Sequence, residues 1–366
     1  ITFNLKMMFM DTESNQDYNK GATFNGKIVI NEGQTSEVTQ GDTAVDTIDK
    51  QLITQDNSLY ETKIFTDNTP DKNVRFTQNE SLTNLTTVSN QNKNNYETKL
   101  LDAISYPNYS NYINIFGQPA QIIGTFNVKN AETGEYERLL KIKLLKKYYS
   151  QLDTNGTNNW ETSNLMQELN SEDNLNFYYE YYKADFDSST ETSQKNGNIY
   201  FDYDNGFGTV DTNIYTGVIA NVEWDIGGID NLNISLENAY KQEKGLTPYT
   251  SNKKTWTGKI GLPSLTDFLY EKLGADCAND LSTCSNLALT KMQASYYYLT
   301  LTKDNTSTSN MYGYDFKTYL PTTSQSGYFF STFYLKKDVK FVCGDGTNNN
   351  PYAITPSECG KMNSGK

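Results

Sequence analysis

Carboxylates are the side chains of this sequence that could do chemistry, because its 366 residues include 44 Asp and Glu but no His. The absence of His excludes Ser-His-Asp and Cys-His nucleophiles, His-ligated metal sites and a His general base. A glycosidase needs only two carboxylates, placed across a cleft at a set separation. Glu223 and Glu237 are the best candidates for such a pair, since both fall on the polar side of one predicted hairpin. A water-facing strand surface explains them more simply, so we expect no enzyme.

Two segments rich in Asn and Asp, residues 153–161 and 202–211, place oxygen atoms at spacings that loosely match calcium-binding loops. Neither segment has the full twelve-residue pattern. Ordinary turns explain both in a chain this rich in Asn and Asp. We therefore predict no metal site and no cofactor.

The four cysteines form two local pairs in the last third of the chain, Cys277 with Cys284 and Cys343 with Cys359. Their spacings match no common zinc motif. An even number of cysteines in local pairs predicts two disulfide-closed loops and an oxidising compartment.

Six Asn-x-Ser/Thr sequons occur, which abundant Asn and Thr would produce by chance. Asn155 is the candidate for a glycan, because Asp153 two residues earlier resembles the context that bacterial N-glycosylation prefers. Asn233 falls within a predicted strand, where a glycan would be poorly accommodated.

The overall charge limits the partners. A formal net charge of −13 and a sequence pI near 4.6 argue against nucleic acid and against an anionic membrane surface. The mean hydropathy is −0.69, and no apolar run approaches the ~18 residues of a membrane-spanning helix. Because the first residue is Ile, we expect a processed chain or a fragment.

Most of these residues would be positioned by strands. Along residues 215–226 one parity carries Thr, Val, Ala, Trp and Ile while the other carries mainly polar residues, which predicts a two-faced strand. A turn with two Gly at residues 227–231 follows, and residues 232–241 alternate again. We therefore predict a long amphipathic hairpin over residues 211–241.

The rest of the chain predicts a mainly β fold, an antiparallel meander with a few short helices. Strands are expected at residues 1–9, 22–30, 60–65, 74–77, 122–127, 135–149, 175–182, 199–204, 295–303, 311–320 and 327–341. A hairpin turn is expected at residues 130–134. Over 135–149, good helix formers allow a helix, but strict alternation favours a strand. Helices are expected at 163–170 and at 263–274, where the spacing of Ser264 and Asp267 fits a capping box. We expect one β-rich domain, residues 1–366, with a polar, loop-rich excursion at 31–106 and a short helical, disulfide-stapled excursion at 262–290.

Two stretches, VEWDIGGIDNLNISLENAY at residues 222–240 and GYDFKTYLPTTSQSGYFFSTFYL at residues 313–335, resemble the short-turn hairpins of Gram-negative outer-membrane porin-like barrels. The resemblance covers about the last half of the chain. It implies a closed transmembrane β-barrel with long polar loops. The chain departs from the family in ending NSGK instead of in a terminal aromatic strand, and in having fewer Gly.

The leading hypothesis is therefore an outer-membrane porin-like or adhesin-like protein that passes small solutes with a weak cation preference. The polar strand faces would line the pore with Glu180, Asp202, Asp204, Glu223, Asp225, Glu237, Lys141, Lys143 and Lys147.

The alternative is a soluble β-sandwich-type extracellular subunit of a filament, S-layer or virion that assembles through strand edges. A carboxylate glycosidase is third. The partners would be the lipid bilayer or copies of the chain itself as a homo-oligomer, at the outer membrane or the cell surface.

Overall fold

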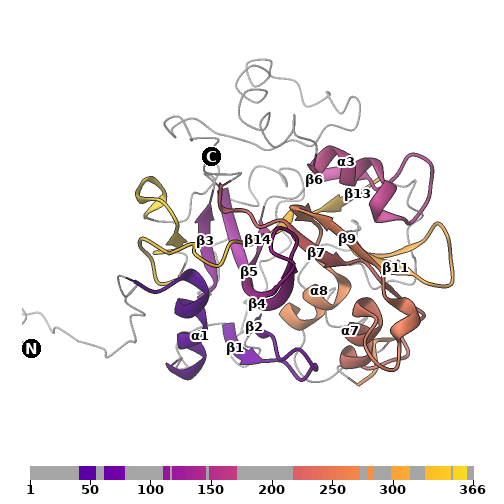
Figure 1. The fold of residues 1–366 in the computed structure, drawn as a ribbon, viewed down its shortest axis with the longest axis horizontal. Coiled ribbons are helices and arrows are strands. Elements are labelled where there is room, and N and C mark those ends of the chain that lie inside the picture. The colour runs from indigo at the N-terminus through magenta and orange to yellow at the C-terminus, as the bar shows by residue number, and fades with distance from the viewer. Residues whose placement is uncertain are drawn as a thin grey trace, which may run out of the picture. The chain divides into compact units, whose positions relative to one another are not determined.

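The computed structural model describes residues 41–54, 62–78, 110–115, 118–145, 148–170, 217–272, 279–282, 298–313, 326–347 and 349–360. The strands are β1 (Thr62–Thr66), β2 (Val74–Gln78), β3 (Tyr112–Ile115), β4 (Gln118–Asn130), β5 (Tyr136–Leu144), β6 (Tyr148–Gln151), β7 (Val222–Asp225), β8 (Gly228–Ile229), β9 (Thr255–Gly258), β10 (Ile260–Gly261), β11 (Leu299–Asp304), β12 (Met311–Gly313), β13 (Ser326–Phe329), β14 (Thr332–Leu335) and β15 (Tyr352–Ala353). The helices are α1 (Ala44–Thr54), α3 (Asn164–Asn170), α7 (Leu236–Lys244) and α8 (Leu265–Lys272) (Figure 1). The predicted mainly β class with a few short helices is confirmed.

The largest sheet follows the order β1-β2-β4-β5-β14-β10, and within the described residues this path is open. One edge of β4 pairs in turn with β3, β2 and β7, while its other edge pairs with β5. Two smaller sheets, β12-β11-β8 and β13-β6, complete the described strands. Most pairs are antiparallel, and β11–β8 and β15–β3 are parallel. Several neighbours are not consecutive, so the sheets are not a simple meander.

The β4–β5 hairpin is the centre of the largest sheet. Its turn closes with hydrogen bonds from the Asn130 N–H to the Glu135 carbonyl (2.8 Å) and from the Gly134 N–H to the Asn130 carbonyl (2.8 Å). Gly134 has a φ of 75°, a conformation that glycine adopts without steric cost. The turn predicted at residues 130–134 and the strand predicted over the following Leu- and Lys-rich run are both confirmed.

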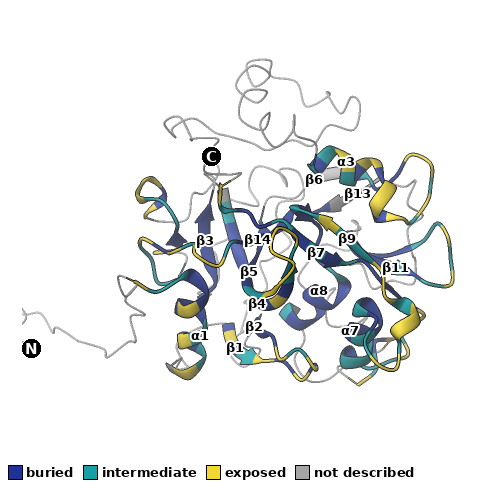
Figure 2. Ribbon diagram, viewed as in Figure 1, coloured by how far each residue is buried: buried dark blue, intermediate teal, exposed yellow. Residues whose placement is uncertain are grey.

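Both faces of β5 are covered by helices of the chain itself. Arg138, on the same parity as Leu140 and Ile142, contacts Asp49 of α1 at 2.6 Å. Lys141 lies on the opposite parity and contacts Asp267 of α8 at 2.6 Å. The last six residues of β5 are therefore buried, and Figure 2 shows dark blue along β5, β4 and α8.

The predicted second strand of the 211–241 hairpin is wrong, because most of that segment is helix α7. The Ser235 hydroxyl accepts a hydrogen bond from the Asn238 N–H, and Gly245 ends the helix with a φ of 58°. Lys241 lies one turn after Glu237 and pairs with it at 2.6 Å. Leu236 and Tyr240 share a parity, but they are also one helical turn apart, so their alternation fitted both structures.

The first half of that hairpin is partly confirmed. Val222 and Trp224 of β7 are buried while Glu223 and Asp225 are half-buried, as the alternation predicts. The strand is short, however, and residues 211–216 lie outside the described residues.

Both predicted helices are present. In α8 the Asp267 N–H donates to the Ser264 hydroxyl (3.1 Å) and the Ser264 N–H donates to the Asp267 carboxylate (3.0 Å), which is the predicted capping box. Leu265, Phe268 and Leu269 are buried against the neighbouring strands. Helix α3 begins where the Ser163 hydroxyl accepts from the Met166 N–H.

The remaining predicted strands divide into two groups. Those at residues 60–65, 74–77, 122–127, 295–303, 311–320 and 327–341 each overlap an observed strand. Those at residues 1–9, 22–30, 175–182 and 199–204 lie outside the described residues. Within the predicted polar excursion at 31–106, the structure describes α1 and the β1–β2 hairpin, and β2 joins the largest sheet through β4.

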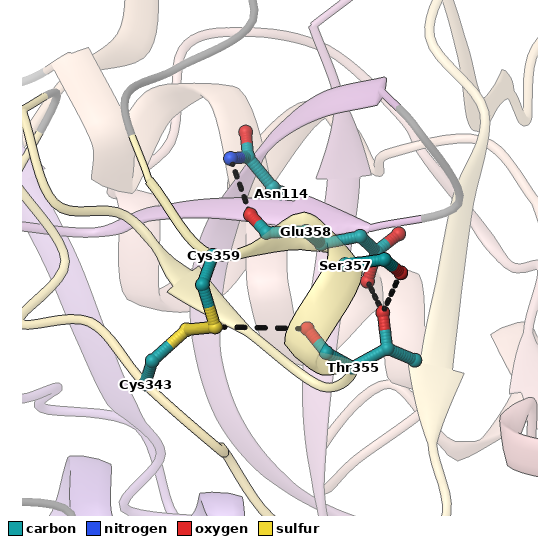
Figure 3. The surroundings of a disulfide bond; sticks show 6 residues. All are labelled: Asn114, Cys343, Thr355, Ser357, Glu358 and Cys359. Carbon is teal, nitrogen blue, oxygen red and sulfur yellow. Dashed lines mark hydrogen bonds between the residues drawn. A yellow bond between two sulfur atoms is a disulfide. The ribbon is translucent and has the colours of Figure 1, made fainter. Parts of the chain in front are cut away.

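The carboxyl-terminal segment is tied to the sheet edge by β15, which pairs with β3. Cys343 and Cys359 form a disulfide with their Cα atoms 6.0 Å apart, which confirms this predicted pair. Figure 3 shows the Asn114 side chain of β3 donating to the Glu358 carbonyl, at 3.0 Å, next to the disulfide. Cys277 and Cys284 lie outside the described residues.

Candidate functional site

Among the described residues, the largest concentration of buried charge lies between the main sheet and helix α8. Across three adjacent strands, Arg75 of β2 is opposite Gly124 of β4, and Gly124 is opposite Lys141 of β5. Residues directly opposite each other in antiparallel strands project on the same face. The two cations therefore stand in one row facing α8, with a glycine between them.

Asp267 of α8 enters the space between the two cations. Its Oδ1 accepts from Arg75 Nη1 at 3.1 Å and its Oδ2 from Lys141 Nζ at 2.6 Å. Burial raises the pKa of Asp267, but the charges of Lys141 and Arg75 outweigh burial and hold that pKa well below its ordinary value. Asp267 therefore stays ionised and bridges both cations.

Arg75 has a second carboxylate partner in the β1–β2 turn. Its Nε donates to Asp67 Oδ2 at 2.7 Å, and both side chains are almost fully buried. Asp67 also accepts hydrogen bonds from Thr69 and Asn73 of the same turn. Two carboxylates and two cations thus form a neutral group, which lowers the cost of burying each charge.

Aromatic rings surround the two cations. The Arg75 guanidinium lies over Tyr270, Phe126 and Tyr240, at 4.3, 4.7 and 5.5 Å from the ring centroids. Lys141 Nζ lies 5.4 Å from the centroids of both Trp224 and Tyr334. These ring faces attract the cations and exclude water from them. The group is therefore suited to holding α8 against the sheet.

The glycine at position 124 allows strands β2 and β4 to approach closely between Arg75 and Lys141. A Cβ built on Gly124 would lie 2.0 Å from the Val74 carbonyl oxygen, which is far inside contact distance. No side chain fits between β2 and β4 at this point.

Half-buried ion pairs continue the network toward the surface. Tyr240 donates to Asp71 at 2.7 Å, and Lys244 lies 3.4 Å from Asp71 and 3.3 Å from Asp225. Lys253 also contacts Asp225, at 2.8 Å. This rim connects α7 with the β1–β2 turn and with β7.

The structure places five of the predicted pore-lining residues, and each has an ion-pair partner. Lys143 contacts Glu271 of α8 at 2.5 Å, so Lys141 and Lys143 both lie under that helix. Glu223 contacts Lys129, Asp225 contacts Lys244 and Lys253, and Glu237 contacts Lys241. Glu180, Asp202, Asp204 and Lys147 lie outside the described residues.

Glu223 and Glu237, the predicted acid pair, sit on separate elements because α7 replaces the second strand. The structure gives each carboxylate a different lysine partner. Their earlier assignment to one polar hairpin face is therefore wrong.

The loop at residues 153–161 is a hydrogen-bonded turn. Asp153 Oδ2 accepts from the Thr157 hydroxyl at 2.7 Å and from the Thr157 N–H at 3.1 Å. Within the part of the chain that the structure describes, no group of three or more His, Cys, Asp or Glu side chains could hold a metal. Asn155 is exposed in this turn, so a glycan there would meet solvent.

The sequence reasoning missed Asp67, Arg75 and Asp267 as a group. Arg75 carried a usable signal, because it is one of only two Arg in the chain and is flanked by Val74 and Phe76 in a predicted strand. An Arg that faces away from buried apolar neighbours yet lies inside a sheet needs an acidic partner. Nothing in the sequence identified Asp67 or Asp267 as the acidic partners of Arg75, and Asp267 is 192 residues away from it.

Among the described residues, no helix is both long and apolar enough to cross a membrane. Comparison with protein-family models gives no match, and searches of curated proteins and of solved structures give no significant match.

Proposed function

We propose that this chain is a non-enzymatic structural subunit of an extracytoplasmic surface assembly, joined to copies of itself through strand edges. The observation that carries the proposal is the burial of β5 on both faces, by α1 and by α8. When both faces of a strand are used inside the chain, partners can reach the sheet only at its edges.

The edge strand that best fits this role is β9. It pairs with β7, and no other described strand pairs with it. The Ile226 N–H donates to the Lys254 carbonyl at 3.0 Å. This bond shows which opposite residues of β7 and β9 form hydrogen-bonded pairs. Because hydrogen-bonded and non-hydrogen-bonded pairs alternate, Trp256 turns its backbone groups toward β7. Thr255 and Thr257 therefore point their N–H and C=O groups away from β7, toward the edge that no described strand occupies.

The use of the described carboxylates supports a structural role. Asp67 and Asp267 form ion pairs within the buried network, and Asp71 and Asp225 form ion pairs in its rim. A general acid or base must reach its substrate directly or through one water, whereas these groups bind lysine or arginine.

The Cys343–Cys359 disulfide supports an oxidising location outside the cytoplasm. The net charge of −13 fits a solvated surface protein.

The experiment is self-association of the detergent-free protein, measured by sedimentation and by negative-stain microscopy. Thr257→Pro removes the outward N–H without touching the ladder to β7, so we expect the association constant to fall about tenfold or more. Thr257→Val is the matched control, because it keeps the N–H and a β-branched side chain. A monomeric wild-type protein, or equal association of both variants, would contradict the proposal.

A porin-like barrel is the second candidate. The alternation of buried Val222 and Trp224 with half-buried Glu223 and Asp225 favours it, because barrel strands show this pattern. It predicts extraction from envelopes only with detergent, and channels in a planar bilayer. The weak cation preference should then fall when Glu223 of β7 is changed to Gln. Protein that is monodisperse without detergent and inactive in the bilayer argues for the structural subunit instead.

A further inference from the structure

Glu243 is a buried carboxylate beside the charge network that has no cation partner among the described residues. It lies in the third turn of α7 with 4% of its surface exposed. Its Oε2 accepts from the Thr266 hydroxyl at 2.5 Å, and its Oε1 accepts from the Thr302 hydroxyl at 2.5 Å and from the Thr266 N–H at 3.2 Å. Its neighbour Asp267, by contrast, binds two cations.

The charged groups that face Glu243 oppose its ionisation or are engaged elsewhere. Helix α8 contributes Asp267, whose negative charge disfavours a second one nearby, and Tyr270. On α7 itself, Lys244 turns to Asp71 and Asp225, Tyr240 binds Asp71, and Glu237 pairs with Lys241. From β11 the contact is the Thr302 hydroxyl, while Asp304 accepts from the Thr306 hydroxyl. Lys303 interacts electrostatically with Lys254 and Glu161.

The hydroxyl groups around Glu243 can serve both of its protonation states. The Thr302 hydroxyl accepts from the Leu265 N–H at 2.8 Å, so its own hydrogen is free to point at Glu243. The Thr266 hydroxyl lies 3.1 Å from the Ser264 hydroxyl. Thr266 can therefore donate to ionised Glu243, or accept from protonated Glu243 while donating to Ser264. A proton can bind here without moving heavy atoms.

We propose that Glu243 is a proton-binding site that makes the junction of α7, α8 and β11 respond to pH, tight when the carboxyl is protonated and weakened when it is ionised. The inference is independent of the proposed assembly role. Burial raises the pKa of Glu243 to about 7, although hydrogen bonds from Thr266 and Thr302 lower it in part.

The sign of the effect follows from linkage. The ordinary pKa is 4.5 and the folded pKa is about 7, so the folded state binds more protons than the unfolded state between these values. Stability is therefore lost as pH rises from about 4.5 to about 7. Because the chain has no His, no imidazole titrates in this range and masks the effect.

The test compares the pH dependence of urea unfolding in the wild type and in Glu243→Gln, which mimics the protonated carboxyl. Between about pH 5 and pH 8 the folding equilibrium constant of the wild type should fall on the order of 100-fold more than that of the variant. Glu237→Gln is the matched control, because this acid lies on the same helix in a half-buried ion pair with Lys241, and it should keep the wild-type slope. Equal slopes for the wild type and Glu243→Gln overturn the proposal.

A second measurement needs no variant. Carboxyl carbon resonances of wild-type Glu, followed by NMR across the same range, should include one that titrates near neutral pH. If every Glu carboxyl titrates below about pH 5.5, the proposal is wrong. A faster amide exchange of α7 and α8 at high pH, after correction for intrinsic rates, would place the response at this junction.

Discussion

Asp267 Oδ2 lies 2.6 Å from Lys141 Nζ, across 126 positions of sequence, and the other oxygen of the same carboxylate accepts from Arg75. One acid on α8 therefore bridges two cations on separate strands of the main sheet. Because all three side chains are buried, water cannot replace any of them. The attachment of α8 to the sheet depends on this carboxylate.

Changing Asp267 to Asn should destabilise the protein strongly. The amide removes the negative charge while Lys141 remains buried with no other ion-pair partner among the described residues, and such a loss costs about 3–5 kcal/mol. Urea unfolding at neutral pH measures it. Glu237→Gln removes a half-buried charge near the surface of a neighbouring helix and should cost less, about 0.5–1 kcal/mol. Similar values for the two variants would contradict the role given to Asp267.

The local structure of this region could be predicted, but its long-range contacts could not. The alternation of Leu140 and Ile142 with Lys141 and Lys143 predicted strand β5, and the Ser264–Asp267 spacing predicted the start of α8. These signals lie within a few residues of each other. That β5 and α8 would meet depends on tertiary packing, so the same lysines were assigned to a water-filled face.

Changing Gly124 to Ala should separate β2 from β4. The added methyl would meet the Val74 carbonyl oxygen, which is backbone and cannot rotate away. Overpacking of this kind costs about 1–3 kcal/mol, and a shift of β2 would also move Arg75. Thermal unfolding tests the loss. Gly217→Ala is the matched control, because a Cβ there has nothing within 4 Å. An unchanged midpoint for Gly124→Ala would refute the close approach.

Removing the Cys343–Cys359 disulfide should weaken the carboxyl-terminal segment. The bond closes a sequence separation of 16 residues, and loops of about 15 residues gain about 3 kcal/mol from closure. The double Ser variant should lose most of this energy and show faster amide exchange in β3 and β15. Exchange equal to that of the wild type would mean that β15 holds its place without the bond.

The predicted disulfide between Cys277 and Cys284 can be tested directly. Cys277 and Cys284 are predicted to pair because of their spacing alone. Mass spectrometry of a non-reduced digest should find peptides linked through these two residues and, separately, through Cys343 and Cys359. Free thiols, or a link between Cys277 and Cys343, would show that local spacing misled the prediction.

Helix α7 shows why the hairpin prediction failed. Its caps, Ser235 and Gly245, are both visible in the sequence, yet the alternation of residues 232–236 extended the preceding strand pattern. Over a segment this short, apolar residues four apart satisfy a helical and a strand period equally. The caps were the signal that distinguishes the two. Glu243 was missed for the same reason, because only a helix turns it toward Thr266 and Thr302.

The last prediction is that the protein is most stable in mildly acidic solution. The pKa of Asp267 is depressed in the folded state, so its contribution is complete above its ordinary value of 3.8 and is lost as pH falls further. The pKa of Glu243 is raised, so stability is lost as pH rises from 4.5 toward 7. The loss of stability below pH 3.8 and the loss above pH 4.5 place the maximum of the free energy of unfolding between about pH 4 and pH 5. Unfolding midpoints measured from about pH 2 to pH 9 should show this maximum, with Asp267→Asn flattening the acidic side and Glu243→Gln the neutral side. A maximum above pH 7 that neither variant moves would show that other groups govern the pH dependence.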